Sequence, residues 1–249
     1  MPTEKREYFY RNVPFNVLVN TEPDNDSSSF TFTDEQVVRD TLFNVKPGDL
    51  VFDVGCGFGS YAFSALAIGA LHAHAWSINT PHVEMMHKSI ALNPGWDSRI
   101  TVNGTGLYKE TGWLCEATQK FSKTWFEGSF PVSTLDDYVS KLPRVMRDTD
   151  LYGRPSTPYL AARGKTWLKI DTEGAELNIL QGAKQFLLDY RPTILLENHE
   201  TLVPGITQAC QDWLHVWQSK GGPGYQVSKW VPYHKVSHSV YLPEECVPS

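Results

Sequence analysis

Apolar residues recur at two different periods along the chain, and the change of period predicts where strands and helices alternate. LVFDVG at residues 50–55 is a continuous apolar run that ends in glycine, which is typical of a strand buried on both faces. The pattern that follows predicts a helix at 60–70, a strand at 72–77, a helix at 81–93 and a strand at 99–104. This alternation favours a parallel sheet that helices cover on both faces.

The same pattern returns after residue 164. KTWLKID predicts a strand, ELNILQGAKQFLLDY at 176–190 predicts one amphipathic helix, and TILLENH predicts another buried strand. A helix is expected at 206–219, and the strands expected at 225–233 and 238–243 could pair antiparallel. The expected fold class is therefore α/β, with a doubly wound, mostly parallel sheet and an antiparallel closing strand.

Three regions lack a clear period. Residues 1–30 are polar and irregular, which is typical of a flexible surface segment, and Thr33 then predicts the N-cap of a helix. The segments at 113–117 and 133–142 could form a strand and a short helix. Residues 143–164 carry several Arg and Tyr side chains without periodicity, as in either a lid for a polar or anionic acceptor or a solvated loop. We expect an N-terminal extension at 1–32 and one domain at 33–249.

Composition narrows the class of protein. The chain has 249 residues, of which 41% are hydrophobic, and a formal net charge of −6, so it offers no overall basic surface for nucleic acid. No apolar run reaches the length of a membrane span, and the first residues lack a secretory signal, which predicts a cytoplasmic protein. The four cysteines are widely spaced, which predicts free thiols rather than a disulfide framework or a zinc site.

A glycine-rich turn, D-V-G-C-G-F-G at residues 53–59, stands between the first predicted strand and its helix. Glycines allow a tight turn there and let a ligand approach the backbone. Dinucleotide-binding turns follow the pattern G-x-G-x-x-G, and this chain has Ser60 in place of the third glycine, which disfavours a nicotinamide enzyme. The turn resembles the first motif of class I S-adenosylmethionine-dependent methyltransferases. The resemblance implies that Asp53 lies under the turn and that Gly55, Gly57 and Gly59 border the methionine part of the cofactor.

A second block of sequence identifies a narrower resemblance. Three motifs resemble the FkbM family of methyltransferases and occur in the family's order along the chain: STLDDYV at 133–139, LKIDTEGAELNILQGAK at 168–184 and RPTILLENH at 191–199. The resemblance covers roughly residues 47–220. The resemblance implies the seven-stranded class I methyltransferase fold and S-adenosylmethionine as cofactor. It also implies O-methylation of a small hydroxylated molecule such as a saccharide or secondary metabolite. The acidic composition and the lack of a long apolar run predict no nucleic acid and no membrane as partner.

The chain departs from this family after its second predicted strand. Family members commonly have an acidic residue there, followed by Pro-Asn, whereas this chain has Ser77-Ile78-Asn79. We expect Ser77 and Asn79 to hold the ribose hydroxyls with lower affinity than a carboxylate would give. Gly104 and Thr105, which follow the third strand, are expected near the adenine.

Two solutions are available for removing the proton of an acceptor hydroxyl. In the first, His199 is the general base and Asp171 or Glu173 is its supporting carboxylate. In the second, a divalent cation such as Mg²⁺ binds Asp171, Glu197 and Asn198 and lowers the pKa of the acceptor. Asn198 itself is a departure, because the family more often has an apolar residue at that place.

Other functions remain as alternatives. A protein that kept the fold as a catalytically weak or inactive binding module is suggested by Ser77. Methylation of nitrogen in a small molecule also remains open. An amino methyltransferase for nucleic acid is disfavoured by the acidic composition and by the absence of an N-P-P-Y or D-P-P-Y tetrad.

Overall fold

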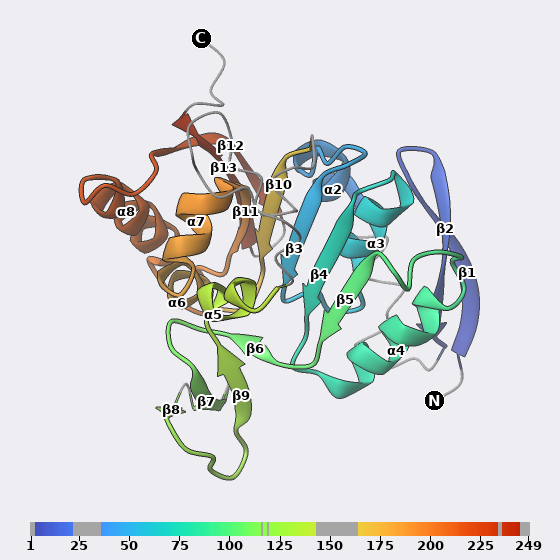
Figure 1. Cartoon of the computed structure of the whole chain (residues 1–249), viewed down its shortest axis with the longest axis horizontal. Helices are drawn as coiled ribbons and strands as arrows, with labels where there is room; N and C mark the ends of the chain where they lie inside the picture. Colours follow the sequence, from blue (N-terminus) through green and yellow to red (C-terminus); the bar gives the residue numbers. More distant parts are fainter. Residues whose placement is uncertain are drawn as a thin grey trace.

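A seven-stranded sheet forms the centre of the molecule in the computed structural model (Figure 1). The structure describes residues 3–21, 36–115, 117–118, 120–142, 164–233 and 236–244. The spatial order of the strands is β12-β13-β11-β10-β3-β4-β5. Their bounds are Leu50–Val54 (β3), His72–Trp76 (β4), Ile100–Asn103 (β5), Thr166–Ile170 (β10), Thr193–Asn198 (β11), Tyr225–Tyr233 (β12) and Val236–Pro243 (β13).

The sheet is mixed. The neighbours from β5 to β11 pair in parallel, whereas β13 is antiparallel to both β11 and β12. The α/β class, the seven strands and the antiparallel pairing of the last two are as expected, but the parallel part is limited to five strands. All five residues of β3 are buried because this strand lies between β10 and β4, which accounts for its unbroken apolar sequence.

Helices lie on both faces of this sheet (Figure 1). Side chains of α3 and α4 belong to one hydrophobic cluster, and side chains of α6, α7 and α8 belong to a second. The helix bounds are Gln36–Leu42 (α2), Ser60–Ala67 (α3), Thr80–Ile90 (α4), Leu135–Ser140 (α5), Glu176–Gln181 (α6), Lys184–Tyr190 (α7) and Ile206–Gln218 (α8). None of the helices in the described part of the chain combines the length and the apolar character needed to cross a membrane.

The expectation of one helix at 176–190 is wrong, because the chain breaks between α6 and α7 at Gly182. A Cβ at Gly182 would lie 2.2 Å from the carbonyl oxygen of Tyr108, so only glycine permits this close approach of two backbones. The carboxylate of Asp136 then accepts hydrogen bonds from the backbone N–H groups of Gln185 and Phe186, at 3.0 and 2.8 Å. A side chain from α5 therefore caps the start of α7, which helical periodicity does not reveal.

The expectation of an irregular N-terminal segment is also wrong for residues 3–20. Strands β1 (Thr3–Tyr10) and β2 (Val13–Asn20) form an antiparallel hairpin. Its two-residue turn, Arg11-Asn12, has positive φ angles of 49° and 65°, as in the primed turns that suit hairpins. The alternate β2 residues Phe15, Val17 and Val19 are buried against the helical face of the main sheet. Thr33, the expected N-cap, lies outside the described residues.

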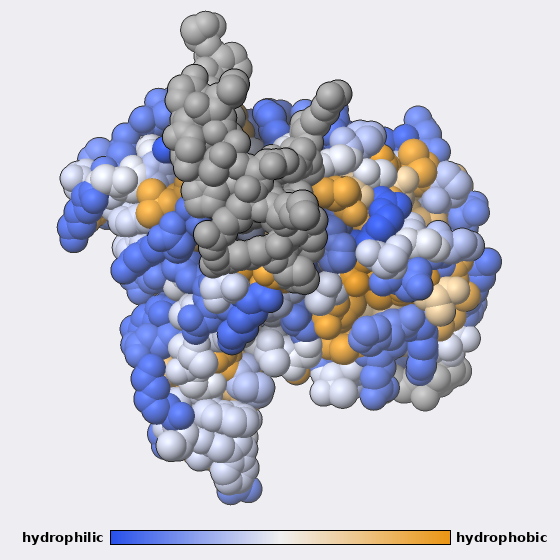
Figure 2. All heavy atoms as spheres, viewed as in Figure 1, coloured by the Kyte–Doolittle hydropathy of each residue, from blue (hydrophilic) through white to orange (hydrophobic). Residues whose placement is uncertain are grey.

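A second, four-stranded sheet projects from the body below α5 and α6 (Figure 1). Its order is β6-β9-β7-β8, with bounds Gly106–Leu107 (β6), Gly112–Cys115 (β7), Lys120–Ser122 (β8) and Phe130–Ser133 (β9). β7 and α5 confirm the strand and the short helix expected in this region. In Figure 2 the surface of this projecting sheet is mostly pale or blue, so the face in view carries no large apolar patch.

Candidate active site

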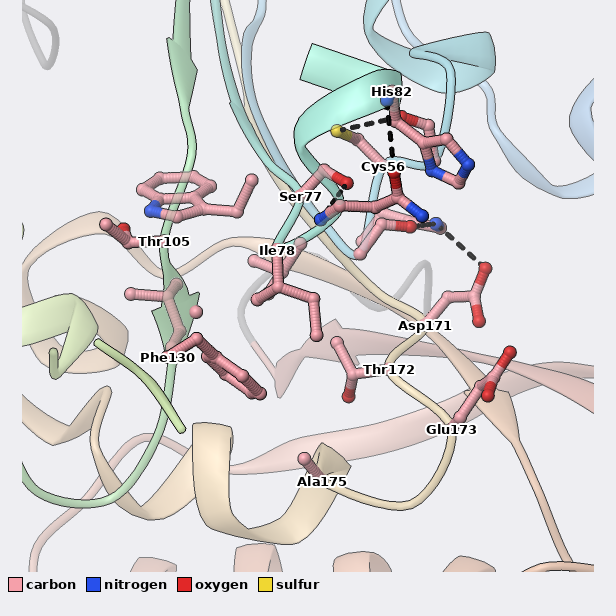
Figure 3. Close-up of a pocket in the computed structure, with 18 of the residues that line it drawn as sticks. Cys56, Ser77, Ile78, His82, Thr105, Phe130, Asp171, Thr172, Glu173 and Ala175 are labelled. Atoms are coloured by element: carbon pink, nitrogen blue, oxygen red, sulfur yellow. Dashed lines mark hydrogen bonds and ion pairs between the residues drawn. The ribbon is translucent and has the colours of Figure 1, made fainter. Parts of the chain in front are cut away.

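The site lies at the carboxyl ends of the parallel strands, where ligands of open α/β sheets bind. A cavity of about 640 Å³ opens there, a volume in the range of small-molecule sites. Its lining comes from the glycine turn after β3, the end of β4, the small sheet and the turn after β10. Figure 3 shows Ser77 and His82 on one side of the cavity and Asp171 and Glu173 on another. The predicted strand ends therefore do meet at one place.

The glycine turn has three glycines with three different surroundings. A Cβ at Gly55 would lie 1.7 Å from the carbonyl oxygen of Asp171, so this glycine lets the turn pack on the end of β10. Gly57 lines the cavity with φ +52°, and a Cβ there would meet no atom within 4 Å. Gly59 faces Met86 of α4 and does not line the cavity, contrary to its expected place beside the cofactor.

Asp53 lies beneath the turn, where the sequence places it, and is fully buried. Its Oδ2 accepts a hydrogen bond from the backbone N–H of Ala62 at 3.0 Å, and its Oδ1 lies 3.4 Å from Lys169 Nζ. Burial raises the pKa of Asp53, while the positive charge of Lys169 acts in the opposite direction. Asp53 therefore fixes the start of α3 and does not reach the cavity itself.

Of the residues predicted to contact the cofactor at the ends of β4 and β5, the structure places some in the lining of the cavity and others outside it. Ser77, Asn79 and Thr105 line the cavity, whereas Gly104 does not. Sequence reasoning missed the contribution of the small sheet, from which Leu114 and Phe130 also line the cavity. No local pattern in the sequence could have placed these two side chains, because the small sheet is brought there by the fold.

Lys169 links the glycine turn to the turn after β10. Its Nζ donates to the carbonyl oxygen of Gly55 at 2.9 Å and to Asp171 Oδ2 at 3.0 Å, and its side chain is 4% exposed. Burial alone raises the pKa of Asp171, but the charges of Lys169 and then His199 outweigh burial and lower it. Asp171 is thereby held as a carboxylate at the edge of the cavity. The KTWLKID pattern could have signalled Lys169, since a lysine in a buried strand requires a partner.

His199 is buried and oriented by Glu176. Its Nδ1 lies 3.0 Å from Glu176 Oε1, and its Nε2 lies 3.6 Å from Asp171 Oδ1 and 3.7 Å from Glu197 Oε1. Burial lowers the pKa of His199, but the hydrogen bond with Glu176 and the charges of Asp171 and Glu197 raise it overall. The carboxylate on Nδ1 is thus Glu176, not Asp171 or Glu173 as expected from the sequence.

Glu176 is itself tightly held. Its Oε1 also accepts hydrogen bonds from the backbone N–H groups of Thr172 and Gly174, at 3.2 and 3.1 Å. Glu173 lines the cavity from the same turn, with a positive φ of 53°. Asp171 and Glu173, in the turn after β10, therefore line the cavity, while Glu176, at the start of α6, contacts His199 and fixes its position.

Asn198 does not join this cluster. Its amide nitrogen donates to the carbonyl oxygen of Ser237 at 3.2 Å and to Ser239 Oγ at 2.9 Å, both on β13. Successive residues of a strand point to opposite faces, so Glu197 and His199 share one side and Asn198 lies on the other. The three groups that converge within 4.8 Å are Asp171, Glu197 and His199. The expected metal-ligand set with Asn198 is therefore corrected to one with His199.

Comparison with known proteins gives a family match for one part of the chain. Residues 158–221 match the model of the methyltransferase FkbM domain. This part of the chain is FkbM-like. The matched segment includes β10, β11 and the turns that carry Asp171 and His199, and it confirms the resemblance found in the sequence. A search of curated proteins found no significant match.

Solved structures show the same fold. The methyltransferase FkbM of Methylobacillus flagellatus KT superposes with a TM-score of 0.52 at 13% identity, over 80% of this chain and 43% of that one. SMU.776 complexed with SAH superposes with a TM-score of 0.50 at 10% identity, over 96% of this chain and 56% of that one. The chain thus spans about half the length of each. These likenesses show that the chain shares the fold of these two proteins.

Proposed function

We propose that the protein is an S-adenosylmethionine-dependent O-methyltransferase whose acceptor is a hydroxyl of a small molecule, such as a saccharide or a secondary metabolite. The observation that carries the proposal is the position of His199. Its Nε2 lies 3.6 Å from Asp171, a carboxylate that lines the same cavity as the glycine turn, and 3.7 Å from Glu197. Asp171 therefore links the cavity of the glycine turn to His199, a group that can take a proton but is not itself among the lining residues.

The residues of the cavity fit the cofactor. Gly57 leaves open space where any side chain would project, and polar atoms of Ser77 and Thr105 line the wall beyond it. Gly55, Gly57, Ser77 and Thr105 would hold the cofactor, which supplies an activated methyl group on a sulfonium. The charge of that sulfonium is matched by the carboxylates of Asp171 and Glu173 at the cavity.

The chain's own part of the reaction is to orient the acceptor and accept its proton. An acceptor hydroxyl that hydrogen-bonds to His199 Nε2 loses its proton to that nitrogen as the new C–O bond forms and the C–S bond breaks. Asp171 and Glu197 then stabilise the imidazolium, and Glu176 keeps the Nδ1 proton in place. The same arrangement would also serve a small-molecule amine, so nitrogen methylation is distinguished by the product.

A divalent cation is a second candidate for the same step. Asp171, Glu197 and His199 each offer one atom to a common space, and their other polar atoms are held by Lys169, His238 and Glu176 respectively. Neighbours that fix the ligands in this way are typical of metal sites. Electron paramagnetic resonance with Mn²⁺ tests this candidate, since a specific site gives a bound signal that Glu197→Gln weakens.

Calorimetry with S-adenosylhomocysteine tests the main proposal. We expect binding in the micromolar range and its loss in Gly57→Arg, because the new side chain would fill the open space at the turn. Gly95→Arg is the matched control, since Gly95 also has a positive φ and open space but does not line the cavity. A wild-type protein that binds nothing at millimolar ligand contradicts the proposal.

Transfer of a radiolabelled methyl group to a panel of hydroxylated small molecules then tests turnover. Labelled ethers support O-methylation and labelled amines support nitrogen methylation. Cofactor binding without transfer to any acceptor favours the alternative of a catalytically weak or inactive binding protein.

A further inference from the structure

Among the described residues, no carboxylate lines the wall of the cavity at the end of β4, where Ser77, Ile78 and Asn79 follow the strand. Ser77 occupies that place and lines the cavity, with 7% of its surface exposed. Its Oγ accepts a hydrogen bond from the backbone N–H of Asn79 at 3.3 Å. A serine hydroxyl can hold one ribose oxygen, so a second group is needed to hold both.

The side chain of Asn79, the expected second group, caps the helix that follows. Asn79 is the N-cap of α4, and its Oδ1 accepts a hydrogen bond from the backbone N–H of His82 at 3.2 Å. An Ncap oxygen satisfies a backbone donor that would otherwise lack an intrahelical partner, so its removal destabilises the helix. The side-chain oxygen of Asn79 is therefore committed to α4 and is not directed at the ligand.

His82 is the polar side chain that takes this position. It lies in the first turn of α4, is partly buried and lines the cavity. Its imidazole packs against the ring of Phe58, with 4.0 Å between the ring centroids. Phe58 belongs to the glycine turn and also lines the cavity, so this contact connects the glycine turn to the first turn of α4.

We propose that His82 and Ser77 together hold the ribose hydroxyls of the cofactor at this wall of the cavity. A neutral imidazole has one donor and one acceptor nitrogen, and each ribose hydroxyl can donate or accept. Phe58 limits the rotation of the imidazole, which reduces the entropy lost when the ligand binds. This proposal rests on the proposed function, because it assumes an adenosine cofactor in the cavity.

Calorimetry on the full chain tests the proposal with two ligands, S-adenosylhomocysteine and its 2′,3′-dideoxyribose analogue. The wild type should prefer the ligand with hydroxyls. His82→Ala should weaken binding of S-adenosylhomocysteine by about tenfold and should largely remove the preference, because the lost bonds involve those hydroxyls. His87→Ala is the matched control, since His87 is exposed on the same helix and does not line the cavity.

Several outcomes separate this proposal from the proposed function. Unchanged preference for the hydroxylated ligand in His82→Ala overturns the role of His82, while wild-type binding still supports the cofactor. Equal binding of the two ligands by the wild type also overturns it. His82→Gln keeps a donor and an acceptor on a flexible side chain and should recover part of the preference, which shows that the loss in alanine is not a folding defect. Ser77→Asp should raise affinity in both the wild-type and His82→Ala backgrounds.

Discussion

Acid is expected to destabilise this fold through one buried histidine of the central sheet. His74 lies on β4 and is 1% exposed, with its ring stacked 4.8 Å from that of Phe52. Its Nδ1 lies 2.8 Å from the hydroxyl oxygen of Tyr138. Burial, and to a lesser extent the charge of His72, lowers the pKa of His74 to about 3. The folded protein therefore keeps this imidazole neutral at pH values where an unfolded chain would protonate it.

The size of the effect follows from the two pKa values. Between the unfolded value of 6.5 and the folded value of about 3, the unfolded chain binds a proton that the folded chain does not. The stability linked to His74 is thus fully present above the unfolded pKa and falls as the pH drops below it. Each pH unit in that window costs about 1.4 kcal/mol, so the free energy of unfolding should fall by about 2 kcal/mol between pH 7 and pH 5.

Urea unfolding at these two pH values measures the effect against a variant that cannot titrate. His74→Phe keeps an aromatic ring beside Phe52 but removes the imidazole, and His87→Phe makes the same change at an exposed position of α4. Between pH 7 and pH 5, the wild type and His87→Phe should each lose about 2 kcal/mol more than His74→Phe. An equal loss in all three proteins would refute the reasoning, because the acid sensitivity would then belong to other groups.

Two further changes test the turns at the site. Gly55→Ala should prevent cooperative folding in thermal melts followed by circular dichroism, since its Cβ would lie 1.7 Å from the carbonyl oxygen of Asp171. Gly95→Ala, at a positive φ but in open space, should cost only about 1 kcal/mol, and equal melts would contradict this distinction. Glu176→Gln should lower turnover by about 10- to 100-fold by loosening His199, with unchanged calorimetric affinity for S-adenosylhomocysteine. Wild-type turnover in that variant would exclude Glu176 as a positioning residue.

Much of the central sheet could be predicted from the sequence because its strands are buried on both faces. Short, unbroken apolar runs such as β3 and β11 are typical of strands in the interior of a parallel sheet. The meeting of Ser77 and Asp171 at one cavity followed from the rule that parallel strands end at one edge of a sheet. The FkbM resemblance was carried by the same strand ends and their turns, and the family match covers part of them.

The remaining features depend on contacts that no local pattern contains. Helical periodicity continues through Gly182, and only the approach of Tyr108 and the cap from Asp136 end the helix there. Glu176 is the first residue of α6, where a carboxylate is favoured by the helix dipole, and only the fold places it beside His199. The N-terminal hairpin is a different case, because the alternation of β2 was available in the sequence but was outweighed by the polar residues around it.

The pairing of β3 with β10 has a consequence for how the protein acquires its site. In the parallel register of these two strands, Leu50 pairs with Thr166 and Val54 pairs with Ile170. More than a hundred residues therefore separate the two strands along the chain. Contacts this distant in sequence form late, because closing the intervening loop costs entropy before the pairing returns any stability. β3, β4 and β5 can associate earlier, as they follow one another closely. A nascent chain would therefore carry the glycine turn but no working site until β10 is inserted beside it.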